Sequence, residues 1–253
     1  MTKRVDPFES PKRRLARAKQ HICRFEKRIQ TFIKKKPYDR TEDTQADGTT
    51  IHALKFTRDF PDSWTDAAVE SLEALRSALD QTGYAAAVLG GTPEPKNAYF
   101  PMGDTIADLD SVTGGRCKDL PAEVRTLFRG FDAHEGGNYA LWALNKLCNA
   151  NKHRLLIPVG VGGGEMTMNR GIISGGDLYA PRWNGAKNQL EFATIRPGGN
   201  LKYDAKITFH IAFDEFNKVK GGPAVGILNT IADEVQRVLL ATKAECQRIG
   251  LLK

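Results

Sequence analysis

Three long segments place an apolar residue at every third or fourth position, and this spacing constrains the fold more than any other feature. Such spacing aligns apolar side chains as one stripe along one face of an α-helix. A shorter amphipathic segment follows Asn138, a residue type that is common at helix N-termini. The spacings predict main helices over 11–36, 63–89, 138–152 and 224–248. The first two have matching stripes and should pack antiparallel.

Between His153 and Gly222 the period changes from about 3.6 to 2. The clearest strand is 203–213, where five apolar residues alternate with polar or small ones. Further β-rich runs lie at 154–161, 166–173 and 188–195, and a short strand is expected over 50–57. Hairpin turns are expected at Trp183-Asn184-Gly185 and at Pro197-Gly198-Gly199-Asn200. We therefore predict a mainly antiparallel meander.

Two segments between the predicted helices contain no clear period. The tract 38–50 is polar, and residues 92–119 are rich in proline, glycine and aspartate. Both are predicted to be loops, with a strand start near residue 50 and a short helix from about 119 to 128.

Together these elements predict an α+β fold: a helical bundle of about four main helices with an inserted, mainly antiparallel β-meander. A chain of 253 residues is long enough to bury a core without disulfides or metal. We predict a single domain over 1–253. Its helical core would be 10–152 plus 223–249, and its β insertion 154–215.

Positive charge is concentrated at the start of the chain. The net charge is +7, and residues 1–40 hold 14 Lys or Arg against 4 acidic residues, so the remaining residues sum to −3. A basic arm on a nearly neutral body can attract nucleic acid or an anionic membrane face. The same pattern fits a solvated helix face, and both interpretations stay open.

Cysteine usage and hydropathy bear on location. The four cysteines are scattered singly, which is typical of core residues in a reducing cytoplasm, and they form no pair at metal spacing. No apolar run approaches the ~20 residues needed to span a membrane, and the first residues lack the apolar stretch of a secretory signal. We therefore expect a cytoplasmic protein with no membrane partner, no metal and no cofactor.

The most unusual polar cluster lies at the end of the third predicted helix. Asn145, Asn149, Lys152 and His153 fall within one arc of about 100° on that helix. An imidazole flanked by amides and cations can act as an acid or base, or bind phosphate. The alternative is the solvent face and C-terminal cap of an amphipathic helix.

A second polar pair lies beside the apolar stripe of the 63–89 helix. Arg76 and Asp80 are one turn apart, so they can pair with each other. Arg76 can alternatively reach across to His153. Since both clusters border the stripes, packed helices should bring Arg76, Asp80, Asn149, Lys152 and His153 to one surface.

Three segments resemble motifs of an uncharacterised bacterial family: Leu75-Arg-Ser-Ala-Leu-Asp80, Phe100-Pro-Met102 and Leu141-Trp-Ala-Leu-Asn145 with Asn149-Ala-Asn-Lys-His-Arg154. The resemblance covers roughly residues 10–160. Its helix pattern, Arg-x4-His, is similar in turn to the HEPN superfamily of helical RNases and nucleotide-binding modules, which often work as dimers. This chain has Gln81 where that pattern has His.

The resemblance implies metal-independent action on RNA or a nucleotide. Arg76 and His153 would be catalytic, with Lys146 as a substitute for the arginine. Asp80, Asn149, Lys152 and Arg154 would bind the substrate. Whether the chain is an enzyme is left open.

Three functions therefore compete. The sequence favours a structural or assembly module that forms a homodimer through the helix seams. The alternatives are a HEPN-like RNA- or nucleotide-acting protein, and a non-enzymatic nucleic-acid-binding module that uses the basic N-terminal helix. The first requires an exposed apolar patch, the second an open groove at Arg76, and the third an exposed basic stripe.

Overall fold

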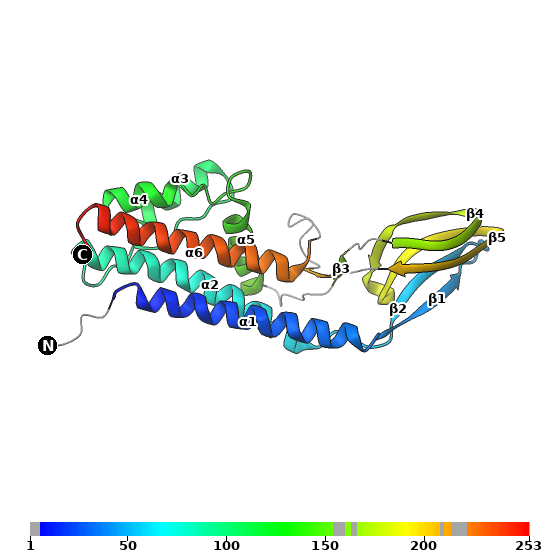
Figure 1. The fold of residues 1–253 in the computed structure, drawn as a ribbon. Coiled ribbons are helices and arrows are strands. Elements are labelled where there is room, and N and C mark those ends of the chain that lie inside the picture. The colour runs from blue at the N-terminus through cyan, green and yellow to red at the C-terminus, as the bar shows by residue number, and fades with distance from the viewer. Residues whose placement is uncertain (1–5, 154–159, 163–165, 208–209, 214–221, 253) are drawn as a thin grey trace. The chain divides into compact units, whose positions relative to one another are not determined.

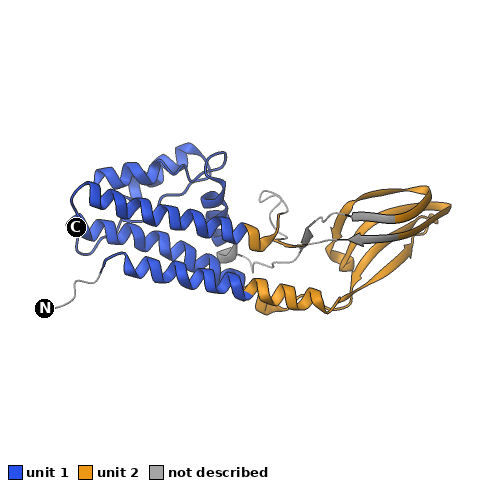
Figure 2. Ribbon diagram, viewed as in Figure 1, with its two compact units in different colours: residues 1–24, 66–156, 227–253 blue, residues 25–65, 157–226 orange. Residues whose placement is uncertain are grey.

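The computed structural model describes residues 6–153, 160–162, 166–207, 210–213 and 222–252. Six α-helices and an antiparallel four-stranded sheet form the described part, which confirms the α+β class (Figure 1). The chain divides into two compact units (Figure 2). The first unit contains 1–24, 66–156 and 227–253, and the second contains 25–65 and 157–226. Within the described residues, no helix has the length and apolar character needed to span a bilayer.

Four helices lie within two residues of their predicted limits. They are α1 (Glu9–Lys34), α2 (Asp62–Leu89), α5 (Tyr139–His153) and α6 (Ala224–Arg248). The start of α5 confirms the predicted cap, because the side-chain oxygen of Asn138 accepts a hydrogen bond from the Leu141 amide at 3.2 Å. Periodicity and capping together therefore locate these helices.

The apolar stripes of these helices form the core of the first unit. Buried members include Leu15, Ala18 and Ile22 of α1, Leu72, Leu75 and Leu79 of α2, Leu141, Leu144 and Leu147 of α5, and Leu228, Ile231 and Val235 of α6. Polar contacts at the margin give the direction of α1 and α2. Ser10 contacts Gln81 at 2.8 Å and His21 contacts Glu70 at 2.8 Å, so the two helices are antiparallel as predicted.

Two shorter helices complete the first unit. The helix α4 (Ala122–Arg129) matches the expectation for that region, but α3 (Ile106–Arg116) lies inside the predicted loop 92–119. The loop prediction is wrong there because a capping box starts the helix. The Thr105 hydroxyl accepts from the Asp108 amide, and the Asp108 carboxylate accepts from the Thr105 amide.

The second unit contains the sheet, whose strand order is β1-β2-β5-β4 with every pair antiparallel. Its strands are β1 (Tyr38–Thr44), β2 (Thr50–Phe56), β4 (Met166–Asn184) and β5 (Gln189–Ile207). The loop predicted over 38–50 is wrong for β1, because an edge strand is held by backbone pairing and needs no alternating apolar pattern. The sheet thus includes 38–56 as well as residues of the predicted insertion 154–215.

One of the two predicted hairpin turns is confirmed. The strands β4 and β5 are joined by a short 3-10 turn, η1 (Gly185–Lys187). The turn predicted at 197–200 is wrong: β5 continues through it, with a pairing irregularity opposite Ser174–Gly176. Glycines at positive φ, Gly175 at 67° and Gly198 at 79°, allow both strands to bend there.

The predicted strand 203–213 is divided. Its first part belongs to β5, and its last part is β6 (His210–Ala212), which pairs with β3 (Gly160–Gly162). The start of the β-rich run predicted at 154–161, residues 154–159, lies outside the described residues.

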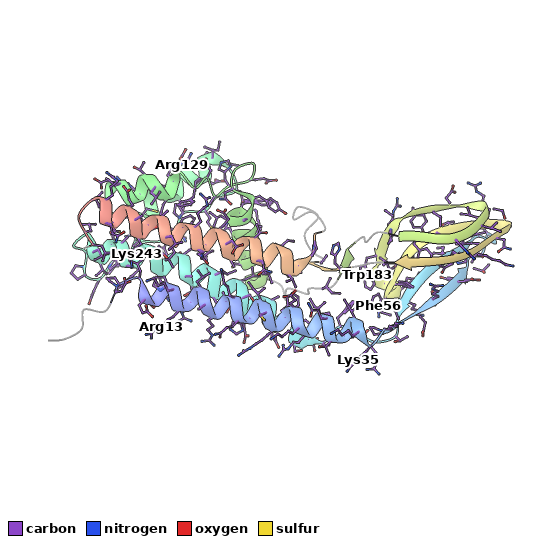
Figure 3. All side chains as sticks on the ribbon, viewed as in Figure 1. Arg13, Lys35, Phe56, Arg129, Trp183 and Lys243 are labelled. Carbon is purple, nitrogen blue, oxygen red and sulfur yellow. The ribbon has the colours of Figure 1, made fainter. Side chains whose placement is uncertain are left out.

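Aromatic rings connect the sheet of the second unit to its helical segments. Phe56 of β2 contacts Phe60 at 5.3 Å and Trp183 of β4 at 5.6 Å, measured between ring centroids (Figure 3). Trp64 at the start of α2 lies 5.5 Å from Phe60 and 5.1 Å from Phe32 of α1. These rings give the second unit its own apolar core.

Candidate ligand-binding cleft

The first unit contains a cleft of about 830 Å³. Side chains from α2, from the segment 95–102, from α3 and from α5 line it. Three of the predicted site residues, Arg76, Asp80 and Asn149, are among them. The volume lies in the range of pockets that bind small molecules and cofactors.

Arg76 and Asp80 form one wall and hold the segment 95–102 in place. The Arg76 Nε atom lies 3.3 Å from the Asp80 carboxylate, as the one-turn spacing predicts. The other carboxylate oxygen accepts from the Phe100 amide at 3.3 Å, and the Arg76 guanidinium also contacts the Met102 sulfur. The first two resemblance motifs are thus hydrogen-bonded to each other.

Two tyrosines stand at the cleft with much of their surface open. Tyr84 of α2 is 48% exposed, and Tyr99 is 44% exposed. A hydrogen bond holds the Tyr99 backbone in place, because its carbonyl oxygen accepts from the Cys117 thiol at 3.2 Å. Burial raises the pKa of this thiol to about 11, so it stays protonated and keeps donating at neutral pH.

Amide side chains from α5 form another part of the lining. Asn149 donates to the Asn145 side-chain oxygen at 3.4 Å, and both residues face the cleft one helical turn apart. Among the described side chains, the Asn145 amide nitrogen and the Asn149 oxygen have no further partner, so both can bind a ligand. An acceptor next to a donor is the pattern by which Asn recognises a base edge.

Arg116 supplies a cation at the end of α3. Its side chain is exposed and, within the described part of the chain, it makes no ion pair. Arg76, by contrast, forms an ion pair with Asp80. Arg116 is therefore the arginine of the cleft that is available to an anionic ligand.

Gln81, where the HEPN-like pattern has histidine, has a clear structural contact. Its side-chain nitrogen donates to the Ser77 hydroxyl at 3.1 Å, and its oxygen accepts from the Ser10 hydroxyl at 2.8 Å. Gln81 therefore joins the start of α1 to α2 at the margin of the cleft.

The remaining predicted site residues are only partly placed. Lys152 and His153 belong to the last turn of α5, but their side chains lie outside the described residues, and Arg154 lies wholly outside them. Cooperation of Arg76 with His153 thus stays a prediction. Lys146 does not line the cleft, because its ammonium pairs with Asp104.

Sequence reasoning missed Tyr84, Tyr99 and Arg116. Arg116 was hidden in the predicted loop, and Tyr99 lies directly before the Phe100-Pro101-Met102 motif, which was the available signal. With them, the cleft combines aromatic rings, amides and an open guanidinium, groups that can bind a planar ring and a phosphate. No group of His, Cys, Asp or Glu suited to a metal ion exists among the described residues.

Comparisons with known proteins assign no family to this chain, which matches no family model, no curated protein and no solved structure.

Proposed function

We propose that the cleft of the first unit binds a nucleotide, either free or as a unit of RNA. The observation that carries this proposal is that two half-exposed tyrosines, two asparagines and Arg116, which has no ion pair among the described residues, line one cleft of about 830 Å³. A planar base can stack on a tyrosine ring, with an energy of about 1–3 kcal/mol per stacked base.

Each kind of side chain in the cleft would contact a different part of the nucleotide. Tyr99 or Tyr84 would contact the base, Asn145 and Asn149 would hydrogen-bond its edge, and Arg116 would bind phosphate. The Arg76–Asp80 pair would act as a positioning element that fixes the segment carrying Tyr99. His153, one turn beyond Asn149, would be the candidate acid or base if RNA is cleaved.

The seam-dimer function has less support. The stripe residues through which a dimer was expected, such as Ile22 and Leu75, are 2% and 0% exposed within one chain. We propose that these stripes pack against one another in a bundle of the four main helices, and that this bundle supports the cleft. A homodimer would then need a different surface.

Titration calorimetry of the full chain with adenosine monophosphate tests whether the nucleotide binds. We expect saturable binding at one site, and weaker binding of inorganic phosphate, which has no ring to stack. Arg116→Gln should weaken nucleotide binding by about ten-fold or more, since a charge-assisted hydrogen bond is lost.

The matched control is Arg125→Gln, which removes an exposed arginine of α4 that does not line the cleft. It should leave the affinity unchanged. Equal effects of the two substitutions would mean that only net charge matters, and absence of binding by the unsubstituted chain would refute the proposed function.

A further inference from the structure

A second hollow, distinct from the cleft, lies wholly within the second unit. Its volume is about 510 Å³, and it lies between the last part of α1 and residues 58–64, which include the start of α2. Four cations and one carboxylate face it: Lys27, Arg28, Lys35, Arg58 and Asp59. Such an excess of positive charge in a concave site favours an anionic ligand.

The cations of α1 lie in a row. Lys27, Arg28, Thr31 and Lys35 fall within about 100° of arc when each residue advances by the helical angle. Lys27 and Lys35 are eight residues apart, which corresponds to about 12 Å along a helix axis. Lys35 follows the last residue of α1, at the end of the helix (Figure 3). The row is long enough for several anionic groups rather than one.

Most of these charges are available. Lys27, Lys35 and Arg58 are exposed and make no ion pair within the residues that the structure describes. Arg28 donates a hydrogen bond to the Ser63 carbonyl at 2.7 Å, which orients its guanidinium. No other described residue accepts from Arg28, so its remaining N–H groups can bind a ligand.

Two aromatic residues line the hollow, Phe32 and Trp64. Trp64 is only 2% exposed, so its ring can neither stack on a base nor insert into a bilayer. Phe32 is partly exposed, but its ring packs against Trp64 at 5.1 Å and against Phe60 at 5.6 Å. The cations are therefore the main binding groups of the hollow, and they favour phosphate groups over bases or lipid chains.

We propose that this hollow binds a row of phosphate groups, as found in the backbone of single-stranded nucleic acid or in inorganic polyphosphate. Lys27, Arg28, Lys35 and Arg58 contact successive phosphates. Because no base is contacted, binding is independent of sequence and falls steeply with salt. The site is separate from the nucleotide cleft and does not depend on it.

The test is fluorescence anisotropy of a labelled single-stranded RNA of mixed sequence with the full chain, measured over a range of salt concentrations. Each phosphate neutralised contributes about 0.7 to the slope of log affinity against log salt. Lys27→Gln/Lys35→Gln should therefore flatten the slope by about 1.4 and weaken binding at low salt.

The control is Lys55→Gln/Lys202→Gln, which removes the same charge from two exposed lysines of the sheet in the same unit. It should leave the slope unchanged. Direct titration with inorganic polyphosphate identifies the source. Loss of RNA binding in the test variant supports nucleic acid, and loss of polyphosphate binding alone supports polyphosphate.

Three outcomes would overturn the proposal. The first is equal slopes in the test and control variants, and the second is no binding of either polyanion by the unsubstituted chain. The third concerns vesicles of phosphatidylcholine and phosphatidylserine, titrated in the same way: the test variant loses binding to the vesicles but keeps its binding to both polyanions. The test variant should keep its affinity for adenosine monophosphate. A failure at the hollow is thereby distinguished from a failure at the cleft.

Discussion

Leu79 shows what a single buried residue contributes to the first unit. It lies in the apolar stripe of α2 and is 0% exposed. Leu79→Ala should lower the free energy of unfolding by about 2–5 kcal/mol, since it removes buried methyl groups and leaves a cavity. Urea denaturation measures this change. Leu240→Ala, at a position of α6 that is 54% exposed, is the matched control and should cost less than about 1 kcal/mol. Similar costs would contradict the burial of the stripe.

Asp6 provides a pH-dependent contact in the same unit. Its carboxylate lies 2.8 Å from the Lys243 ammonium and 3.0 Å from that of Lys12. The hydrogen bond from Lys243 is the main cause that holds the pKa of Asp6 well below its usual range, against the opposing effect of burial. A carboxyl group with a lowered pKa stabilises the fold above its unfolded-state pKa, about 3.9, and loses that contribution as the pH falls.

Asp6→Asn should therefore cost about 1 kcal/mol at pH 7, as expected for a partly exposed ion pair. The difference from the unsubstituted chain should stay constant down to about pH 5 and shrink as the pH falls below about 4. Urea denaturation at several pH values measures it. A difference that does not change with pH would show that the charge of Asp6 makes no contribution.

At the residue scale, the sequence allowed prediction of contacts within one helix but not of contacts between segments. The Arg76–Asp80 pair follows from its one-turn spacing. The bond from the Phe100 amide to Asp80 spans 20 residues, so it depends on how the segment 95–102 folds back, which has no periodic signal. The place of Arg116 in the cleft likewise depends on how residues 92–119 fold back, so the sequence did not reveal it.

Among the helices, α2 contains a glycine where the chain needs one. A methyl group at Gly83 would lie 2.1 Å from the Ala98 carbonyl oxygen, next to Tyr99. Gly83→Ala should therefore destabilise the protein by about 1–3 kcal/mol, although alanine is the better helix former. It should also weaken nucleotide binding, because Ala98 and Tyr99 must shift. Thermal denaturation and calorimetry measure both effects.

Gly114 of α3 is the control for Gly83. No atom lies within 4 Å of a methyl group at that position. Gly114→Ala should thus leave stability unchanged or raise it by up to about 1 kcal/mol. If both substitutions stabilise the protein, the close approach of α2 and the segment 95–102 is wrong.

The helices and strands that could be predicted are those whose own sequence contains the signal for their structure. The main helices have long apolar stripes, and β4 and β5 meet at a turn of suitable residues. The strand β1 is polar and is determined by its partner β2, and α3 depends on one capping box followed by a weakly amphipathic sequence. Their signals are short or lie elsewhere in the chain, so periodicity did not reveal them.

For the whole molecule, the division into two compact units does not follow the order of the chain. The first unit is assembled from three stretches of the chain and the second from two. The long helices α1 and α2 each contribute to both units, so no linker marks a boundary. The apolar stripes are buried inside the chain, so the binding sites that we propose are the polar cleft and the cationic hollow.

The central claim is that the cleft of the first unit is the nucleotide site, and the most direct measurement is a titration with adenosine monophosphate followed by amide NMR chemical shifts. Saturable shifts are expected in residues 81–84, 98–102 and 145–149, which contain many of the residues that line the cleft. Arg116→Gln should make these shifts clearly smaller at the same ligand concentration and move their saturation to a concentration about ten-fold higher or more. Shifts that are absent, or that are confined to residues 27–35, would contradict the claim.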